Sequence, residues 1–186
     1  MRIYTRQGDA GMTRLADGSA LAKVHWRVES YGQVDTLNSH IGLLVTCLPD
    51  GSDDLADKLQ LIQQEMFDLG SELAFPADAQ NETLWQVSEQ WTLRLEAEMD
   101  AFSETLPALR HFILPGGSLA AAQAHVVRTL VRSCERQLVA LSHQEPLNPA
   151  VLPYMNRLSD WFFVLARVLL LRENKPELRW KKPAER

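Results

Sequence analysis

Residues 53–74 read DDLADKLQLIQQEMFDLGSELA and are the most informative stretch for the fold class. The apolar positions alternate gaps of four and three residues, at Leu55, Leu59, Ile62, Met66, Leu69 and Leu73. This spacing places them on one face of a helix, as in helices that pack side by side in a bundle. Ser52 is a plausible cap, and the acidic residues after it favour a helix N-terminus. The stretch therefore predicts one helix of a bundle.

Similar spacing predicts four more helices, over residues 25–48, 88–105, 119–142 and 150–173. Short segments rich in proline and glycine separate them. Residues 1–24 contain several turn formers and predict an ordered loop or short hairpin. Residues 174–186 have no apolar period, so we expect a frayed or disordered tail. Together these patterns predict a single domain over residues 1–186, with an all-α fold that is a five-helix bundle.

The charges are unevenly distributed along the chain. The net charge of −5 argues against a general nucleic-acid binder. Residues 50–105 carry fourteen acidic and two basic groups, so we expect this segment to face outward and keep the bundle in solution. The rest of the chain carries seventeen basic and ten acidic groups, which leaves positive charge for binding an anion.

Other features narrow the class of protein. No apolar run reaches the length of a membrane span, so we expect no membrane association. Cys47 and Cys134 are far apart in sequence, which suits reduced thiols in the cytoplasm. The five histidines fall at no metal-ligand spacing, and the glycine motifs of the common nucleotide-binding folds are absent. Any nucleotide site must therefore use another phosphate cradle.

The first candidate site is the segment YTRQGDAGMTR at residues 4–14. Gly8 and Gly11 let the backbone turn and bring its N–H groups near an anion. Arg6 and Arg14 add guanidinium groups, whose planar fork suits phosphate oxygens. The same segment also fits a plain surface loop, and the residues alone leave both interpretations open.

The second candidate is a row of arginines in the fourth predicted helix. Arg128, Arg132 and Arg136 are four residues apart and share one face, with Glu135 beside them. Three guanidinium groups repel one another unless an anion or acid lies among them. A solvated charged face is the usual explanation, but the rest of this helix is apolar. The row therefore fits a solvated face and an interface or cleft about equally well.

Three single residues complete the candidates. Asp35 lies inside a well-formed helix, where it needs water or a cation, for example an arginine of another helix or subunit. Asn156, near a helix start, can bond a base, a ribose or only the backbone. Phe112 precedes a rigid Pro-Gly-Gly turn, where an aromatic ring is normally core but can also wall a pocket for a large flat ligand.

Taken in order, five segments resemble the PduO-type ATP:cob(I)alamin adenosyltransferase family. They are YTR-x-GD-x-G-x-T from residue 4, YG-x-VD-x-LNS-x-IG from residue 31, FILPGG from residue 112, R-x-x-x-R-x-x-ER from residue 128 and NRLSD from residue 156. The resemblance covers nearly the whole chain. It implies a ferritin-like five-helix bundle that assembles as a homotrimer, with the active site between subunits and an irregular N-terminal loop that binds ATP.

The implied reaction moves the 5′-deoxyadenosyl group of ATP to the cobalt of cob(I)alamin, giving adenosylcobalamin and triphosphate, with Mg²⁺ as cofactor. The ATP-binding residues implied are Thr5, Arg6, Gln7, Gly8, Thr13, Arg14, Lys23, Arg132, Glu135, Arg136 and Asn156, with Glu135 an indirect contact of Mg²⁺. The implied cobalamin-binding residues are Phe112, Phe163, Asp35 and Arg128. Among these, Asp35 and Arg128 would form a salt bridge across the subunit interface, and Phe112 would keep the lower axial ligand off cobalt. Arg132, Arg128 and Asp35 are the implied catalytic residues.

The chain also departs from the family pattern, at Gln7, Thr36, Ser19-Ala20 and Ser133-Cys134. The loss of an arginine at Ser133 would weaken the affinity for ATP. The resemblance further implies two kinds of protein partner, a cobalamin reductase and an adenosylcobalamin-dependent enzyme. Two alternatives remain open at this point: a delivery protein that binds adenosylcobalamin without turnover, and a non-catalytic helical bundle whose arginines pair with the acidic segment.

Overall fold

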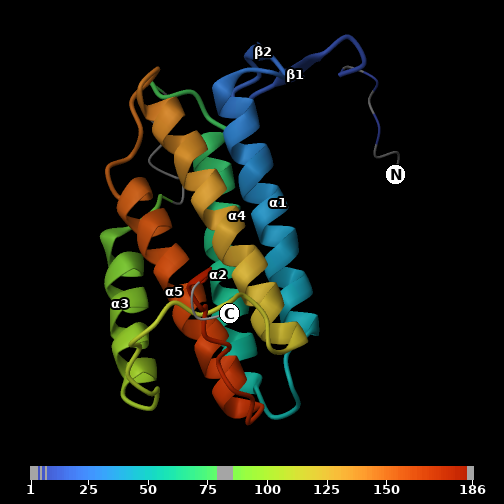
Figure 1. Cartoon of the computed structure of the whole chain (residues 1–186). Helices are drawn as coiled ribbons and strands as arrows, with labels where there is room; N and C mark the ends of the chain where they lie inside the picture. Colours follow the sequence, from blue (N-terminus) through green and yellow to red (C-terminus); the bar gives the residue numbers. More distant parts are fainter. Residues whose placement is uncertain (1–3, 5, 7, 79–85, 184–186) are drawn as a thin grey trace.

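The computed structural model describes residues 4, 6, 8–78 and 86–183 of the chain and shows a five-helix bundle (Figure 1). A short antiparallel hairpin of β1 (Met12–Arg14) and β2 (Ala20–Ala22) precedes the helices. The helices are α1 (Trp26–Thr46), α2 (Asp53–Leu73), α3 (Glu89–Ser103), α4 (Leu119–Ser142) and α5 (Val151–Arg172). The predicted fold class is therefore confirmed, as is the hairpin expected near the N-terminus.

The apolar spacing explains how the helices pack. All six apolar positions quoted from residues 53–74 are buried on α2. Helix α1 packs against α2 and α4, and α5 packs against α4 and α3. The Ser118 hydroxyl accepts a hydrogen bond from the Ala121 N–H (3.1 Å) and caps α4, whereas Ser52 makes no side-chain cap bond. In the part of the chain that the structure describes, no helix is both long and apolar enough to cross a membrane.

Part of the acidic segment lies inside the bundle, contrary to the expectation that it faces outward. Glu65 is buried and accepts hydrogen bonds from Arg94 and, at 2.7 Å, from the Tyr154 hydroxyl. Glu98 accepts a bond from the Trp161 ring N–H at 2.8 Å. These carboxylates serve as acceptors for buried donors of α5, because a buried polar group without a partner is costly.

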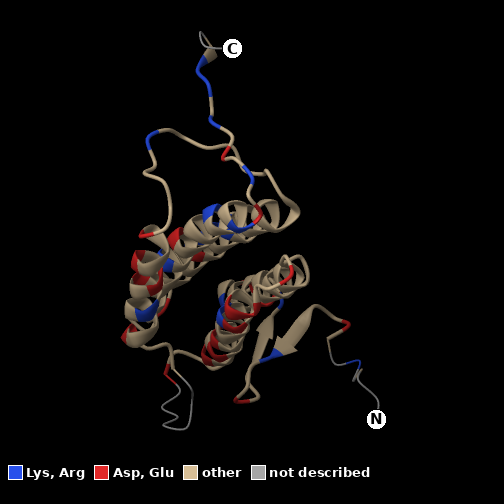
Figure 2. Ribbon diagram, turned by 90° about the horizontal axis from the view of Figure 1, so that it is seen from below, with Lys and Arg blue, Asp and Glu red and all other residues tan. Residues whose placement is uncertain are grey.

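The C-terminal tail also differs from the expectation of a frayed end. The Leu114 N–H donates to the Leu178 carbonyl (2.7 Å), and the Trp180 N–H donates to the Phe112 carbonyl (2.8 Å). The Trp180 ring meets the Phe112 ring edge to face, with centroids 6.4 Å apart. Figure 2 shows this basic segment running from the bundle to the C-terminus. The tail pairs with a loop distant in sequence, which local periodicity does not reveal.

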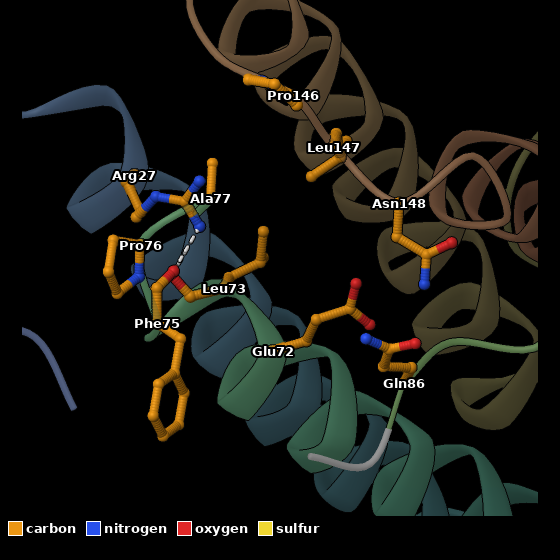
Figure 3. A pocket seen from close by; sticks show the side chains of 10 residues that line it. All are labelled: Arg27, Glu72, Leu73, Phe75, Pro76, Ala77, Gln86, Pro146, Leu147 and Asn148. Carbon is orange, nitrogen blue, oxygen red and sulfur yellow. Dashed lines mark hydrogen bonds between the residues drawn. The ribbon is translucent and has the colours of Figure 1, made fainter. Parts of the chain in front are cut away.

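Arg27 joins three parts of the chain at one end of the bundle. Its guanidinium is buried and donates to the carbonyls of Leu73 (3.1 Å) and Phe75 (2.7 Å). Its other side pairs with Glu145 at 2.7 Å. Figure 3 shows Arg27 reaching the backbone of Phe75 at the edge of a polar pocket of about 260 Å³. Every contact of Arg27 is thus internal, which indicates a structural role.

Replacing Arg27 with alanine is expected to lower the free energy of unfolding by about 3 kcal/mol, because it strands Glu145 and two carbonyls. The matched control is Arg172→Ala, which removes a solvent-exposed ion pair with Asp54 and should cost less than about 1 kcal/mol. Urea denaturation of both variants measures the difference. Equal losses in the two variants would contradict the structural role of Arg27.

Candidate functional site

The arginine row of α4 is exposed along one face of the helix. Arg132 and Arg136 form no salt bridge with any residue that the structure describes. Arg128 is half-buried, and its burial, followed by the nearby charge of Arg132, lowers its pKa. The residues between the arginines, such as Val131 and Cys134, are buried in the core. This face therefore presents positive charge without an internal counter-charge, as an anion-binding surface requires.

Glu135 and Asn156 connect this row to α5. The Asn156 side-chain amide donates to a Glu135 carboxylate oxygen at 2.9 Å. Glu135 thus forms no salt bridge with the arginines beside it. No group of three metal-binding side chains occurs among the described residues. A single carboxylate still fits a Mg²⁺ ion held mainly by phosphate oxygens and water, which is how Mg²⁺ commonly binds.

A pocket of about 490 Å³ opens beside the row. It brings together Phe112, Arg128 and Phe163, which the sequence analysis placed in one binding set. Phe112 is 82% exposed, so its ring is available to a ligand. The loop residues Leu109, Arg110, His111, Ile113 and Pro115 form much of the remaining wall. The pocket can hold a large ligand with aromatic rings on one side and a guanidinium group on another.

His125 also lines this pocket, and the sequence analysis missed it. The side chain is only 4% exposed, and its ring meets Phe163 edge to face with centroids 6.1 Å apart. Burial, and then the charge of Arg128, lowers the pKa of His125 to about 4. The available signal was a histidine within the buried apolar stripe of α4, three residues before Arg128.

Acid is expected to destabilise the fold through His125. Because its pKa is about 4 in the folded state against 6.5 ordinarily, the unfolded chain takes up the proton first. The contribution of neutral His125 to the free energy of unfolding is therefore complete above pH 6.5. As the pH falls toward 4, up to about 3 kcal/mol of it is lost. As the pH is lowered from 7 to 4, the free energy of unfolding should decrease more steeply for the wild type than for His125→Phe. Parallel profiles would contradict this expectation.

The N-terminal segment forms a separate group. The Lys23 ammonium lies close to the loop backbone at Gly8, where an added Cβ atom would be 3.1 Å from it. Arg6 lies over the Tyr4 ring, and Arg14 donates to the Gly18 carbonyl at 2.7 Å within the hairpin. Thr13 pairs with Leu21 in the hairpin. Thr5 and Gln7 lie outside the described residues.

Asp35 lies on α1 and does not contact the Arg128 pocket. It is exposed and borders a groove of about 220 Å³ with Tyr31 and Phe67, between α1 and α2. The hairpin contacts the bundle at the C-terminal end of α2, where the Ala16 N–H donates to the Ala74 carbonyl. Figure 1 shows the hairpin and the N-terminal segment extending from the end of α1. Asp35 therefore lies apart from the pocket of Arg128, whereas the start of α1 lies near the arginine row, because the Gln137 side chain, next to Arg136, donates to the Trp26 carbonyl at 3.4 Å.

The structure places three of the residues that depart from the family pattern. Cys134 is buried, and burial raises the pKa of its thiol to about 12, so it faces the core rather than the arginine row. The Thr36 hydroxyl donates to the Gly32 carbonyl within α1. Ser133 is half-buried next to Arg132 and supplies no charge there.

Comparisons with known proteins show which family this chain matches. Residues 3–169 match the family model described as cobalamin adenosyltransferase. A cobalamin adenosyltransferase of Cupriavidus metallidurans is 46% identical, over 99% of this chain and 96% of that protein. A corrinoid adenosyltransferase of Bacillus subtilis is 41% identical, over 99% of this chain and 94% of that protein.

A solved structure is similar throughout. It is a variant of the PduO-type ATP:corrinoid adenosyltransferase of Lactobacillus reuteri, complexed with cobalamin and ATP. The two chains share 40% identity, and the superposition has a TM-score of 0.93 over 97% of this chain and 100% of the other.

Proposed function

The chain belongs to the cobalamin adenosyltransferase family, and on this premise we propose that it transfers the 5′-deoxyadenosyl group of ATP to the cobalt of cob(I)alamin. The products are adenosylcobalamin and triphosphate. The observation that carries the proposal is the pocket in which Phe112, Phe163 and Arg128 meet, beside Arg132 and Arg136, which form no salt bridge with the described residues. A pocket that can hold a large flat ligand thus lies next to a positively charged surface that can bind a polyanion.

In the proposed reaction, cobalt(I) attacks the 5′ carbon of ATP, a Co–C bond forms and the C–O bond to triphosphate breaks. Cobalt(I) is already a strong nucleophile, so the protein needs no general base and contributes position and electrostatics. Arg132 and Arg136 are the groups best placed to bind the triphosphate, whose charge grows as it leaves. The Asn156 side-chain amide donates to the Glu135 carboxylate at 2.9 Å, which links Glu135 to α5 beside the arginines.

The rings of Phe112 and Phe163 would contact the corrin. We place Phe112 on the side from which the lower axial ligand approaches cobalt. An apolar ring there excludes that ligand and leaves cobalt four-coordinate, which eases its reduction to the Co(I) state. The backbone pairing of Phe112 with Trp180 holds the loop that presents this ring.

We propose that the complete site forms between two subunits of a homotrimer. Lys23, Gly8 and Asp35 lie on one part of the chain, and the arginine row and the pocket lie on another. A ring of identical chains can join the first group of one subunit to the second group of its neighbour. Asp35, which is exposed, would then pair with Arg128 of the next subunit. The N-terminal loop with Thr5, Arg6, Gln7, Thr13 and Arg14 would close over the ATP phosphates.

Three further assignments follow the family. Mg²⁺ would bind to the phosphates with Glu135 as an indirect contact, where it would neutralise the charge of the leaving triphosphate. We place the protein in the cytoplasm, in keeping with its two free thiols. A cobalamin reductase would supply cobalt(I), and an adenosylcobalamin-dependent enzyme would receive the product.

The proposal is tested by incubating the protein with ATP, Mg²⁺ and reduced cobalamin. We expect the visible spectrum to change to that of adenosylcobalamin, with one triphosphate released for each corrinoid converted. Tight corrinoid binding without triphosphate would identify a delivery protein instead. Absence of binding to both ATP and the corrinoid would identify a structural bundle.

A further inference from the structure

His125 occupies a position in the pocket that the proposed function does not yet use. It lies on α4 one turn before Arg128, between that residue and the Phe163 ring of α5. The side chain is 96% buried, since only 4% of its surface is exposed. A histidine this well buried normally has both ring nitrogens satisfied by hydrogen bonds.

The contact with Arg128 determines which nitrogen of His125 carries the proton. The Arg128 Nε–H group donates to His125 Nδ1, with the two nitrogen atoms 3.4 Å apart. A guanidinium group has donors only, so Nδ1 must act as the acceptor in this bond. The imidazole is neutral near pH 7, because burial and Arg128 lower its pKa to about 4. The single ring proton is therefore on Nε2.

That Nε2–H group has no hydrogen-bond partner among the residues that the structure describes. An unpaired buried donor costs roughly 1–3 kcal/mol, and a phenylalanine of similar shape would avoid the cost. The donor belongs to a side chain that lines the pocket beside the arginine row. The Nε2 atom is itself buried, so a ligand in that pocket would satisfy it by displacing the neighbouring side chains and bringing a carbonyl oxygen against the ring.

We propose that His125 is a substrate-positioning residue, whose Nε2–H donates to a carboxamide carbonyl at the edge of the corrin while Nδ1 fixes the Arg128 side chain. This inference rests on the proposed function, since it takes the corrin as the occupant of the pocket. The corrin ring of cobalamin carries several acetamide and propionamide side chains, so carbonyl acceptors surround the ring. The bond orients the ring against Phe112 and Phe163.

The test compares His125→Phe and His125→Gln with the wild type in adenosylation assays. His125→Phe keeps a ring against Phe163 but has no donor, so the KM for the corrinoid should rise about tenfold, with the KM for ATP unchanged. His125→Gln restores an N–H near the position of Nε2 and should recover most of the affinity. A structural role alone would shift the Tm without this selective change in one KM.

Cobinamide, which keeps the ring carboxamides but lacks the lower nucleotide, identifies the acceptor. The His125→Phe variant should raise the KM for cobinamide as much as that for cobalamin. An effect limited to cobalamin would overturn the assignment to a ring carboxamide. A wild-type corrinoid KM in folded His125→Phe would overturn the whole inference while leaving the adenosylation of the wild type, and thus the proposed function, intact.

One measurement needs no variant. The ¹⁵N spectrum of histidine-labelled wild-type protein at pH 7 should show His125 as the neutral form with the proton on Nε2. A proton on Nδ1 would exclude the hydrogen bond from Arg128 and overturn the inference, even if every variant failed to fold.

Discussion

Replacing Arg132 with alanine is expected to lower kcat/KM for adenosylation by a factor of about 10²–10³, with the oligomeric state unchanged. Loss of one donor that faces developing charge in a transition state typically costs this much. Arg132 is exposed and forms no salt bridge with the described residues, so its removal leaves no buried partner stranded. The loss should therefore be one of activity and not of stability.

Two variants make this prediction specific. Arg132→Lys keeps the charge but loses the planar fork that contacts two phosphate oxygens, so its activity should fall between those of the wild type and the alanine variant. Arg172→Ala removes an arginine paired with Asp54 on the surface and should keep wild-type kcat/KM. Steady-state assays and size-exclusion chromatography of all three variants provide the measurements. Unchanged turnover in Arg132→Ala would refute its assigned role.

The helices were predictable because their signal is local. The apolar spacing of residues 53–74 and 119–142 defines one buried face each, and the observed bounds of α2 and α4 agree with the predicted ones within a residue. The segments rich in proline and glycine also indicated, from sequence alone, where the other helices end. Local spacing also placed Arg128, Arg132 and Arg136 on one face.

Features that depend on contacts distant in sequence were missed. The pairing of Leu178 and Trp180 with the loop around Phe112 uses backbone groups, which leave no pattern in the tail sequence. The buried position of Glu65 depends on the Tyr154 hydroxyl of another helix. His125 was overlooked because a histidine in an apolar stripe usually belongs to the core, and only the pocket shows what it faces.

The proposed sharing of the site between subunits leads to the second large expected effect. Lys23→Glu reverses a charge in the N-terminal segment, and Arg132→Ala removes the donor on α4. In the proposed homotrimer, each variant alone should be inactive. A trimer that contains both kinds of chain has two copies of one variant and one copy of the other. In either composition, one of its three interfaces joins an intact N-terminal segment to an intact arginine row. Such a trimer has one complete site of three.

The most direct test of a site shared between subunits is therefore the activity of mixed trimers. The two variants, carrying different affinity tags, are co-expressed and purified through both tags in succession. A shared site predicts about one third of the wild-type specific activity for adenosylcobalamin formation, from two parents that are each inactive. A site contained within one chain predicts no activity in the mixture. Mixed trimers as inactive as their parents would contradict the shared site.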